Sequence, residues 1–241
     1  MQRDNPYYNA RVKYYPNGTQ KITVFNRGVF NPDGWERIRK EDEEEKDRRE
    51  YDLTNPREDN VKRAKDKIFD IAFMNEWDYM VTLTLDQAKI DRYDAKEINK
   101  RVGKWLKNQV QRKDLRYLVI PEYHKDGAVH FHGFFKGNMT YLNTGKKDKS
   151  GREIFNIKDW RFGFSDAVRL DDNRLAVARY ITKYITKCTT KIMGKFYYAG
   201  GGITREVPSD YAHVDYDAVE GTEYEIPQAG MRVKYIVVGE L

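Results

Sequence analysis

The sequence predicts an α+β protein built on one antiparallel sheet with helices on one of its faces. Segments in which apolar residues alternate, as in strands, recur along the chain and are interrupted by single segments with the helical apolar period. An aromatic content of 14% argues against disorder, because disordered chains are poor in aromatic residues. The length of 241 residues suits one domain, or one domain with appended arms.

Each expected element has a local reason. Residues 11–25 form a hairpin, because two alternating segments flank a Pro-Asn-Gly turn. Asp171 or Asp172 suits the N-cap of a helix over 172–187. A second helix, over 94–112, has a basic outer face and an apolar stripe that consists of Ile98, Val102, Trp105 and Leu106. The other expected elements are a helix over 60–74, a Gly/Lys-rich hairpin loop over 144–151, and strands over 79–85, 115–124, 128–135, 162–168, 195–202 and 232–238.

Charge is strongly segregated along the chain. Residues 95–113 and 174–195 each carry a net charge of +6, whereas residues 206–225 carry −7. Separate basic stretches are typical of a surface that binds a polyanion, with nucleic acid the first candidate. On charge alone, solvated helix faces are the better explanation.

Composition also divides the chain and limits its compartment. We expect an N-terminal hairpin with a charged helix or linker over 1–58, a main domain over 59–205, and an acidic tail with a final strand over 206–241. A lone cysteine, Cys188, excludes a disulfide framework and a multi-cysteine zinc site, and fits a reducing compartment. Because no apolar run reaches about 18 residues and the N-terminus has no apolar signal segment, we expect a cytoplasmic protein without a membrane partner.

A histidine hairpin is the first candidate site. His130 and His132 flank Phe131 on an expected strand, so both imidazoles point to one face of the sheet. Two imidazoles and one carboxylate suit a divalent cation, Mn²⁺ or Mg²⁺, with positions left for water or substrate oxygens. A polar strand face in contact with water is the alternative explanation of this motif.

The register of the hairpin decides whether Glu122 can complete that site. With a two-residue turn, Asp126-Gly127, Glu122 pairs with Phe131 and faces away from the histidines. With a three-residue loop that adds Lys125 and places Gly127 in the left-handed conformation, Glu122 lies opposite His130. Both turns are chemically allowed.

A tyrosine helix is the second candidate site. Tyr180, Lys183, Tyr184 and Lys187 fall on one stripe, while the core-facing stripe consists of Leu175, Ala178, Ile181 and Ile185. A free phenol has a pKa of about 10, and neighbouring ammonium groups favour the phenolate and attract a phosphate. Aromatic residues and lysines on a basic helix have this spacing without any function too.

Together these residues resemble a known superfamily. His130-Phe131-His132 matches the His-hydrophobe-His motif of HUH-type endonucleases, which include relaxases and rolling-circle replication initiators. The wider segment 120–133 is similar to the initiators of Gram-positive plasmids and phages, and Val81–Leu85 is similar to their first motif. The tyrosine pair with its lysines resembles their tyrosine motif, and the three motifs come in the family's order.

The resemblance implies a fold and a reaction. The fold is a five-stranded antiparallel palm of the ferredoxin or RNA-recognition-motif type, with the histidine strand central. A tyrosine attacks a phosphate of single-stranded origin DNA and leaves a 5′-phosphotyrosyl enzyme and a free 3′-OH. In the paired-tyrosine branch Tyr184 aligns as the primary nucleophile, and Tyr180 is a second nucleophile or a positioning residue. The metal lies on His130, His132 and Glu122.

The same resemblance implies partners. They are single-stranded origin DNA with a hairpin, in a bacterial host cell, and the host DNA polymerase. A host helicase is also expected, because the sequence has no phosphate-loop motif. The expected DNA contacts are Thr82, Thr84, Lys104, Lys107 and Arg179.

Three other functions fit parts of the pattern. A conjugative relaxase shares the chemistry. A non-catalytic protein that binds single-stranded nucleic acid explains the charge and the aromatic content, but neither the histidines nor the tyrosine stripe. A metal-dependent phosphodiesterase that activates water would leave the tyrosines without a role.

Overall fold

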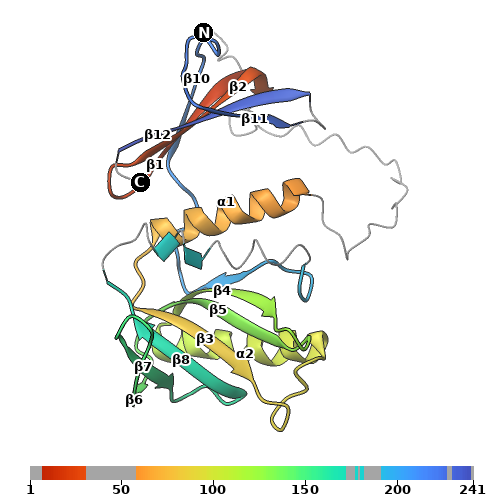
Figure 1. Ribbon diagram of the computed structural model, residues 1–241, viewed down its shortest axis with the longest axis vertical. Helices are drawn as coiled ribbons and strands as arrows, with labels where there is room; N and C mark the ends of the chain where they lie inside the picture. The colour runs from red at the N-terminus through yellow and green to blue at the C-terminus, as the bar shows by residue number, and fades with distance from the viewer. Residues whose placement is uncertain are drawn as a thin grey trace, which may run out of the picture. The chain divides into compact units, whose positions relative to one another are not determined.

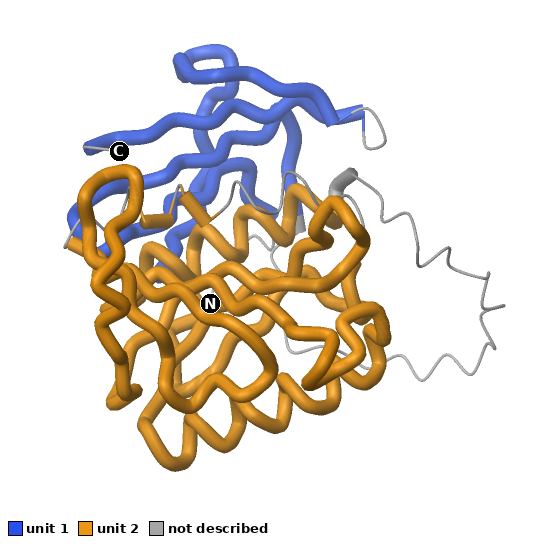
Figure 2. Tube along the Cα trace, turned by 60° about the horizontal axis from the view of Figure 1, so that its bottom comes forward, with its two compact units in different colours: residues 1–49, 207–241 blue, residues 50–206 orange. Residues whose placement is uncertain are grey.

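The chain forms two compact units. The computed structural model describes residues 7–30, 58–171, 177–178, 180–181, 191–226 and 230–239. One unit combines the two ends of the chain, Met1–Arg49 and Val207–Leu241, and the other is Glu50–Glu206 (Figure 2). None of the helices among these residues is long and apolar enough to cross a membrane.

The larger unit is built on a seven-stranded antiparallel sheet (Figure 1). Its strand order is β6-β7-β8-β3-β5-β4-β9, so β5 lies in the interior between β3 and β4. The elements of this unit are α1 (Glu58–Met74), β3 (Tyr79–Leu85), α2 (Ala95–Lys113), β4 (Arg116–Tyr123), β5 (Val129–Lys136), β6 (Tyr141–Lys147), β7 (Glu153–Ile157), β8 (Gly163–Arg169) and β9 (Tyr198–Gly200).

The α+β class is confirmed, but a single five-stranded sheet is wrong. The segment expected to be a hairpin loop, 144–151, is mostly extended, because β6 and β7 form a hairpin whose second strand pairs with β8. At the other edge, β9 pairs with β4. Local patterning identifies strands but does not count the neighbours that each strand acquires.

Helices on one face of the sheet is also wrong, because α1 and α2 lie on opposite faces (Figure 1). Phe134 and Phe135 are consecutive residues of β5, are fully buried, and point to opposite faces. The ring of Phe135 lies 6.2 Å from Trp105 of α2, whereas the ring of Phe134 lies 5.8 Å from Trp77, just after α1. Each face of the sheet therefore has its own apolar cover.

Helix α2 forms where the sequence predicts it. The carboxylate of Asp94 accepts hydrogen bonds from the backbone N–H groups of Lys96 at 2.8 Å and Glu97 at 3.0 Å, which caps the helix N-terminus. The predicted apolar stripe is buried against the sheet, with Trp105 packed edge-on against Trp160. Burying each large apolar side chain contributes about 1.5–3 kcal/mol, so this stripe anchors the helix.

The expected helix over 172–187 is described at four residues, all helical: 177, 178, 180 and 181. Ala178 and Ile181 are fully buried, which confirms two members of the predicted core stripe. Leu175 and Ile185, the other two, lie outside the described residues.

The smaller unit is a five-stranded antiparallel sheet of order β10-β1-β2-β12-β11. The predicted N-terminal hairpin is confirmed, and it pairs on both sides with strands from the C-terminal end of the chain. The ammonium group of Lys234 donates hydrogen bonds of 2.9 Å to the carbonyl oxygens of Tyr216 and Val219. Its strands are β1 (Tyr7–Tyr14), β2 (Gln20–Phe30), β10 (Ser209–Ala212), β11 (Thr222–Ile226) and β12 (Met231–Val238).

Gly133 allows β4 and β5 to pack closely behind the histidines. A Cβ atom built on Gly133 would lie 2.2 Å from the carbonyl oxygen of Leu118 and 2.7 Å from the Cα of Val119. Both contacts are with backbone, which cannot move aside without opening the strand pair. No side chain fits at this position.

We expect Gly133→Ala to lower the free energy of unfolding by at least about 2 kcal/mol, because the added methyl group overpacks the sheet. Gly103→Ala is the matched control: Gly103 lies inside α2 with nothing within 4 Å of its built Cβ. This second change should raise stability by about 0.5–1 kcal/mol, the difference in helix propensity. Urea unfolding of both variants tests the pair, and a Gly133→Ala protein as stable as the unchanged chain would contradict the packing argument.

Candidate metal centre

The turn between β4 and β5 has the three-residue loop that brings Glu122 to the histidines. Gly127 has a φ of 83°, and its N–H donates to the carbonyl oxygen of His124. The N–H of His124 in turn donates to the carbonyl oxygen of Ala128 at 2.7 Å. In this register Glu122 pairs directly with His130, as the three-residue alternative predicts.

Three side chains meet on one face of the sheet. A carboxylate oxygen of Glu122, Oε2, lies 3.4 Å from Nε2 of His130 and 3.3 Å from Nε2 of His132. The three side chains are only 12–16% exposed, so the group is sheltered but open to solvent. One ligand atom from each residue lies within 4.8 Å of the others, which is close enough for all three to bind one metal ion. We call Glu122, His130 and His132 the metal group, and the sheet face that carries them the histidine face.

Thr82 orients one of the two imidazoles. It pairs with His132 across β3 and β5, and its Oγ1 lies 3.2 Å from Nδ1 of that ring. A hydrogen bond at Nδ1 leaves Nε2 pointing at Glu122, which is the geometry that outer hydrogen bonds impose on metal-binding histidines. Thr84 pairs with His130 in the same way, and no hydrogen bond joins those two side chains in the described part of the chain.

The electrostatic environment keeps His130 in its ligand form. Burial lowers the pKa of His130 below its ordinary value, and the hydrogen bond to Glu122 only partly offsets this effect. A lower pKa means that the imidazole stays neutral to more acidic pH. Neutral imidazole is the form that binds a metal.

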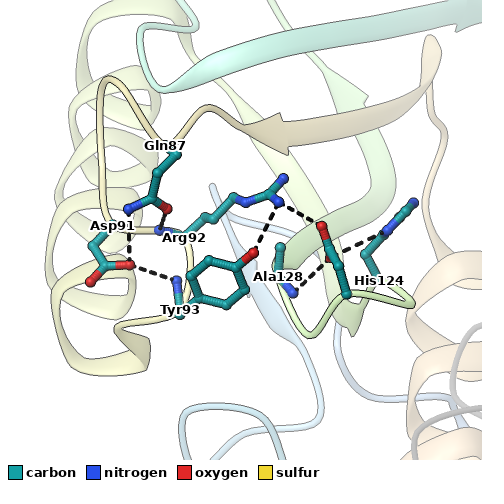
Figure 3. Close-up of polar contacts among 7 residues, drawn as sticks. Gln87, Asp91, Arg92, Tyr93, His124 and Ala128 are labelled. Atoms are coloured by element: carbon teal, nitrogen blue, oxygen red, sulfur yellow. Dashed lines mark hydrogen bonds and ion pairs between the residues drawn. The ribbon is translucent and has the colours of Figure 1, made fainter.

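A polar network holds the turn from outside the hairpin (Figure 3). The guanidinium of Arg92, in the β3–α2 loop, donates to the carboxylate of Asp126 at the tip of the turn and to the hydroxyl of Tyr93. The backbone carbonyl of Arg92 also accepts from the N–H of Val129, the first residue of β5. Backbone donation from Ala128, followed by the charge of Arg92, lowers the pKa of Asp126, so this carboxylate stays ionised. The loop therefore fastens the turn by side chain and backbone together.

His124 belongs to this network rather than to the metal group. Its Nδ1 lies 3.3 Å from Oδ1 of Asp126, and its side chain is 61% exposed. Its ring packs edge-on against that of His130, with centroids 5.6 Å apart. The three-residue metal group of the described chain does not include it.

The structure gathers some of the expected DNA contacts and separates others. Thr82 and Thr84 lie on the histidine face, beside the metal group. Lys104 and Lys107 are exposed on α2, which packs against the opposite face of the sheet. Arg179 lies outside the described residues.

The tyrosine helix is described only in part. Tyr180 is half-buried on a helical segment. Tyr184, Lys183 and Lys187 lie outside the described residues. The nucleophile and its two lysines therefore stay predictions from the sequence.

Comparison with known proteins adds one finding to this geometry. Residues 78–189 match a family model of replication-associated proteins, the ORF2 family. The matched segment begins just before β3 and contains the metal group and both tyrosines. The chain has no match among curated proteins or among solved structures.

The sequence analysis missed Arg92. Its partner Asp126 lies 34 residues further along the chain, in a different turn. An arginine in a polar loop has no local pattern that distinguishes it, so only the fold reveals the contact.

We expect Thr82→Val to weaken Mn²⁺ binding by roughly 10- to 100-fold, the usual effect of losing a partner of a metal-bound histidine. Valine keeps the shape of the side chain and its preference for strands but removes the hydrogen bond to His132. Thr84→Val is the matched control and should bind Mn²⁺ as the unchanged protein does. Titration followed by the electron paramagnetic resonance of free Mn²⁺ measures both. Equal affinities of the two variants would contradict the role of Thr82.

Proposed function

We propose that this protein is a metal-dependent tyrosine endonuclease and strand transferase that nicks single-stranded DNA at a replication origin and so starts rolling-circle replication. The observation that carries the proposal is the metal group, which lies within the segment that matches the replication-associated family model. Metal group and tyrosine helix together suit phosphoryl transfer to a side chain better than either does alone.

The residues of the metal group fit a divalent cation. Two imidazole nitrogens and one carboxylate oxygen are a ligand set suited to Mn²⁺, and Mg²⁺ is the oxygen-preferring alternative. When bound, such an ion supplies positive charge to the oxygens of a phosphate under attack. His130 and His132 hold the ion, Glu122 balances its charge, and Thr82 fixes one ring.

In the proposed reaction a phosphodiester is exchanged for a phosphotyrosine. The phenol oxygen of Tyr184 forms a bond to phosphorus, and the phenolic proton is released. The bond from phosphorus to the 3′ oxygen breaks, and that oxygen takes up a proton to become a free 3′-OH. Lys183 and Lys187 favour the phenolate and attract the phosphate. Tyr180 repeats the exchange in the joining step.

The first test is a covalent adduct on a denaturing gel. The full-length protein, Mn²⁺ and labelled single-stranded DNA from the origin of its own replicon should give one. His130→Ala and His132→Ala should each lower adduct formation by more than about 1,000-fold, a loss typical of residues that act as a unit. EDTA should have the same effect, and DNA binding should persist.

Tyrosine variants separate the two nucleophiles. Tyr184→Phe keeps the ring but removes the attacking oxygen, so most of the adduct should disappear. Tyr180→Phe should still nick but should join strands poorly. An adduct that forms with both tyrosines changed would overturn the mechanism. Metal-dependent cleavage without any adduct would instead favour a phosphodiesterase that activates water.

The second test concerns the basic face of α2. Affinity for single-stranded DNA should fall steeply with salt, because each neutralised phosphate releases counterions. If Lys104 and Lys107 contact phosphates, changing both to Ala should reduce the slope of log affinity against log salt by about 1.4, or about 0.7 for each contact. An unchanged slope would exclude this side of the sheet from the DNA-binding surface.

A further inference from the structure

Phe164 stands in the same row of the sheet as the metal group. Residues paired across β4, β5, β3 and β8 form a row on the histidine face that runs Glu122, His130, Thr84 and Phe164. Neighbouring strands lie about 4.8 Å apart, so Phe164 stands about 10 Å from His130. Only Thr84, a small side chain, lies between them in this row.

The exposure of Phe164 is unusual for its type. Its side chain is 71% exposed, the highest value among the large hydrophobic residues in the described part of the chain. Phe162, two residues earlier, is buried and packs on Trp160 with ring centroids 5.2 Å apart. Phe164 therefore contributes little to the core, and its ring faces the space above the histidine face.

The other end of the same face is closed. A parallel row contains Leu118 and Phe134, both fully buried, and Trp77 packs on Phe134. The open part of the face therefore extends from the metal group across Thr84 to Phe164. An extended strand of nucleic acid with a phosphate at the metal group has this direction available.

The surroundings of Phe164 favour a base over a phosphate. Asp166, the next residue of β8 on this face, is exposed and paired with Thr82, and its negative charge repels phosphate. An aromatic ring stacks on the face of any unpaired base, whereas paired bases in a duplex have no free face.

We propose that Phe164 is a stacking platform for an unpaired base of the single-stranded DNA substrate, next to the phosphate held at the metal group. This inference rests on the proposed function. It identifies Phe164 as a substrate-positioning residue for DNA that is single-stranded on both sides of the nick.

Binding of a fluorescent single-stranded oligonucleotide, measured by anisotropy without metal, tests the platform. Phe164→Ala should weaken affinity roughly 5- to 150-fold, the range for losing one base–aromatic stack. Phe164→Trp should retain the affinity, and Phe164→Leu, which is apolar but has no ring, should not. Tyr123→Ala is the control, because Tyr123 is 48% exposed on β4 but points away from the histidine face. Its affinity should equal that of the unchanged protein.

Phe164→Trp adds a spectroscopic readout. Its extra indole fluorescence, relative to the unchanged chain, should be quenched by the single-stranded oligonucleotide and not by the same sequence as a duplex. In adduct formation, Phe164→Ala should raise the KM for DNA and leave kcat within about twofold. Wild-type affinity of Phe164→Ala, or wild-type affinity of Phe164→Leu, would overturn the stacking role.

The two proposals fail in different ways. If the unchanged protein forms no adduct with Mn²⁺, the proposed function fails, whatever the oligonucleotide binding. If the adduct forms and depends on His130 but the Phe164 variants bind as the unchanged chain does, only the platform is wrong.

Discussion

The metal group depends on the register of one hairpin. Because side chains alternate between the two faces of a strand, a slip of one residue would turn Glu122 away from both histidines. The three-residue turn prevents that slip, since Gly127 adopts a left-handed conformation that other residues rarely take. Asp126 accepts from Ala128 inside the turn, and Arg92 fastens it from the neighbouring loop. The site therefore owes its geometry to backbone constraints around it.

The sheet that carries this hairpin separates support from function. One face is buried under α2, with apolar side chains from β3, β4 and β5. The other face changes along its length, from fully buried side chains near Trp77 to the sheltered metal group and then to the open row that ends at Phe164. Functional side chains on such a rigid element keep their relative positions, which favours precise binding of an ion. Gly133 belongs to the same arrangement, because it lets the two strands approach directly behind His132.

The two ends of the chain meet in a sheet of their own. Strand β2 pairs with β12, and β1 pairs with β10, so the acidic segment over 206–225 supplies edge strands rather than a tail without structure. Residues about 200 positions apart are joined, as in the hydrogen bond from Asn9 to the carbonyl oxygen of Val214. All three residues of the metal group, and the whole segment that matches the family model, belong to the larger unit.

The sequence by itself determined the local features. The strand over 79–85, the apolar stripe of α2 with its Asp94 cap, the N-terminal hairpin and the alternation of His130 and His132 all follow from spacing and turn chemistry. It left two turns open for Glu122, and the tertiary structure decided between them through contacts with Arg92, which lies in another loop. The number of strands, the helices on opposite faces and the exposure of Phe164 were also decided only by the tertiary structure. Each depends on pairing between segments far apart in the chain, and the free energy of such pairing lies in packing that no local pattern records.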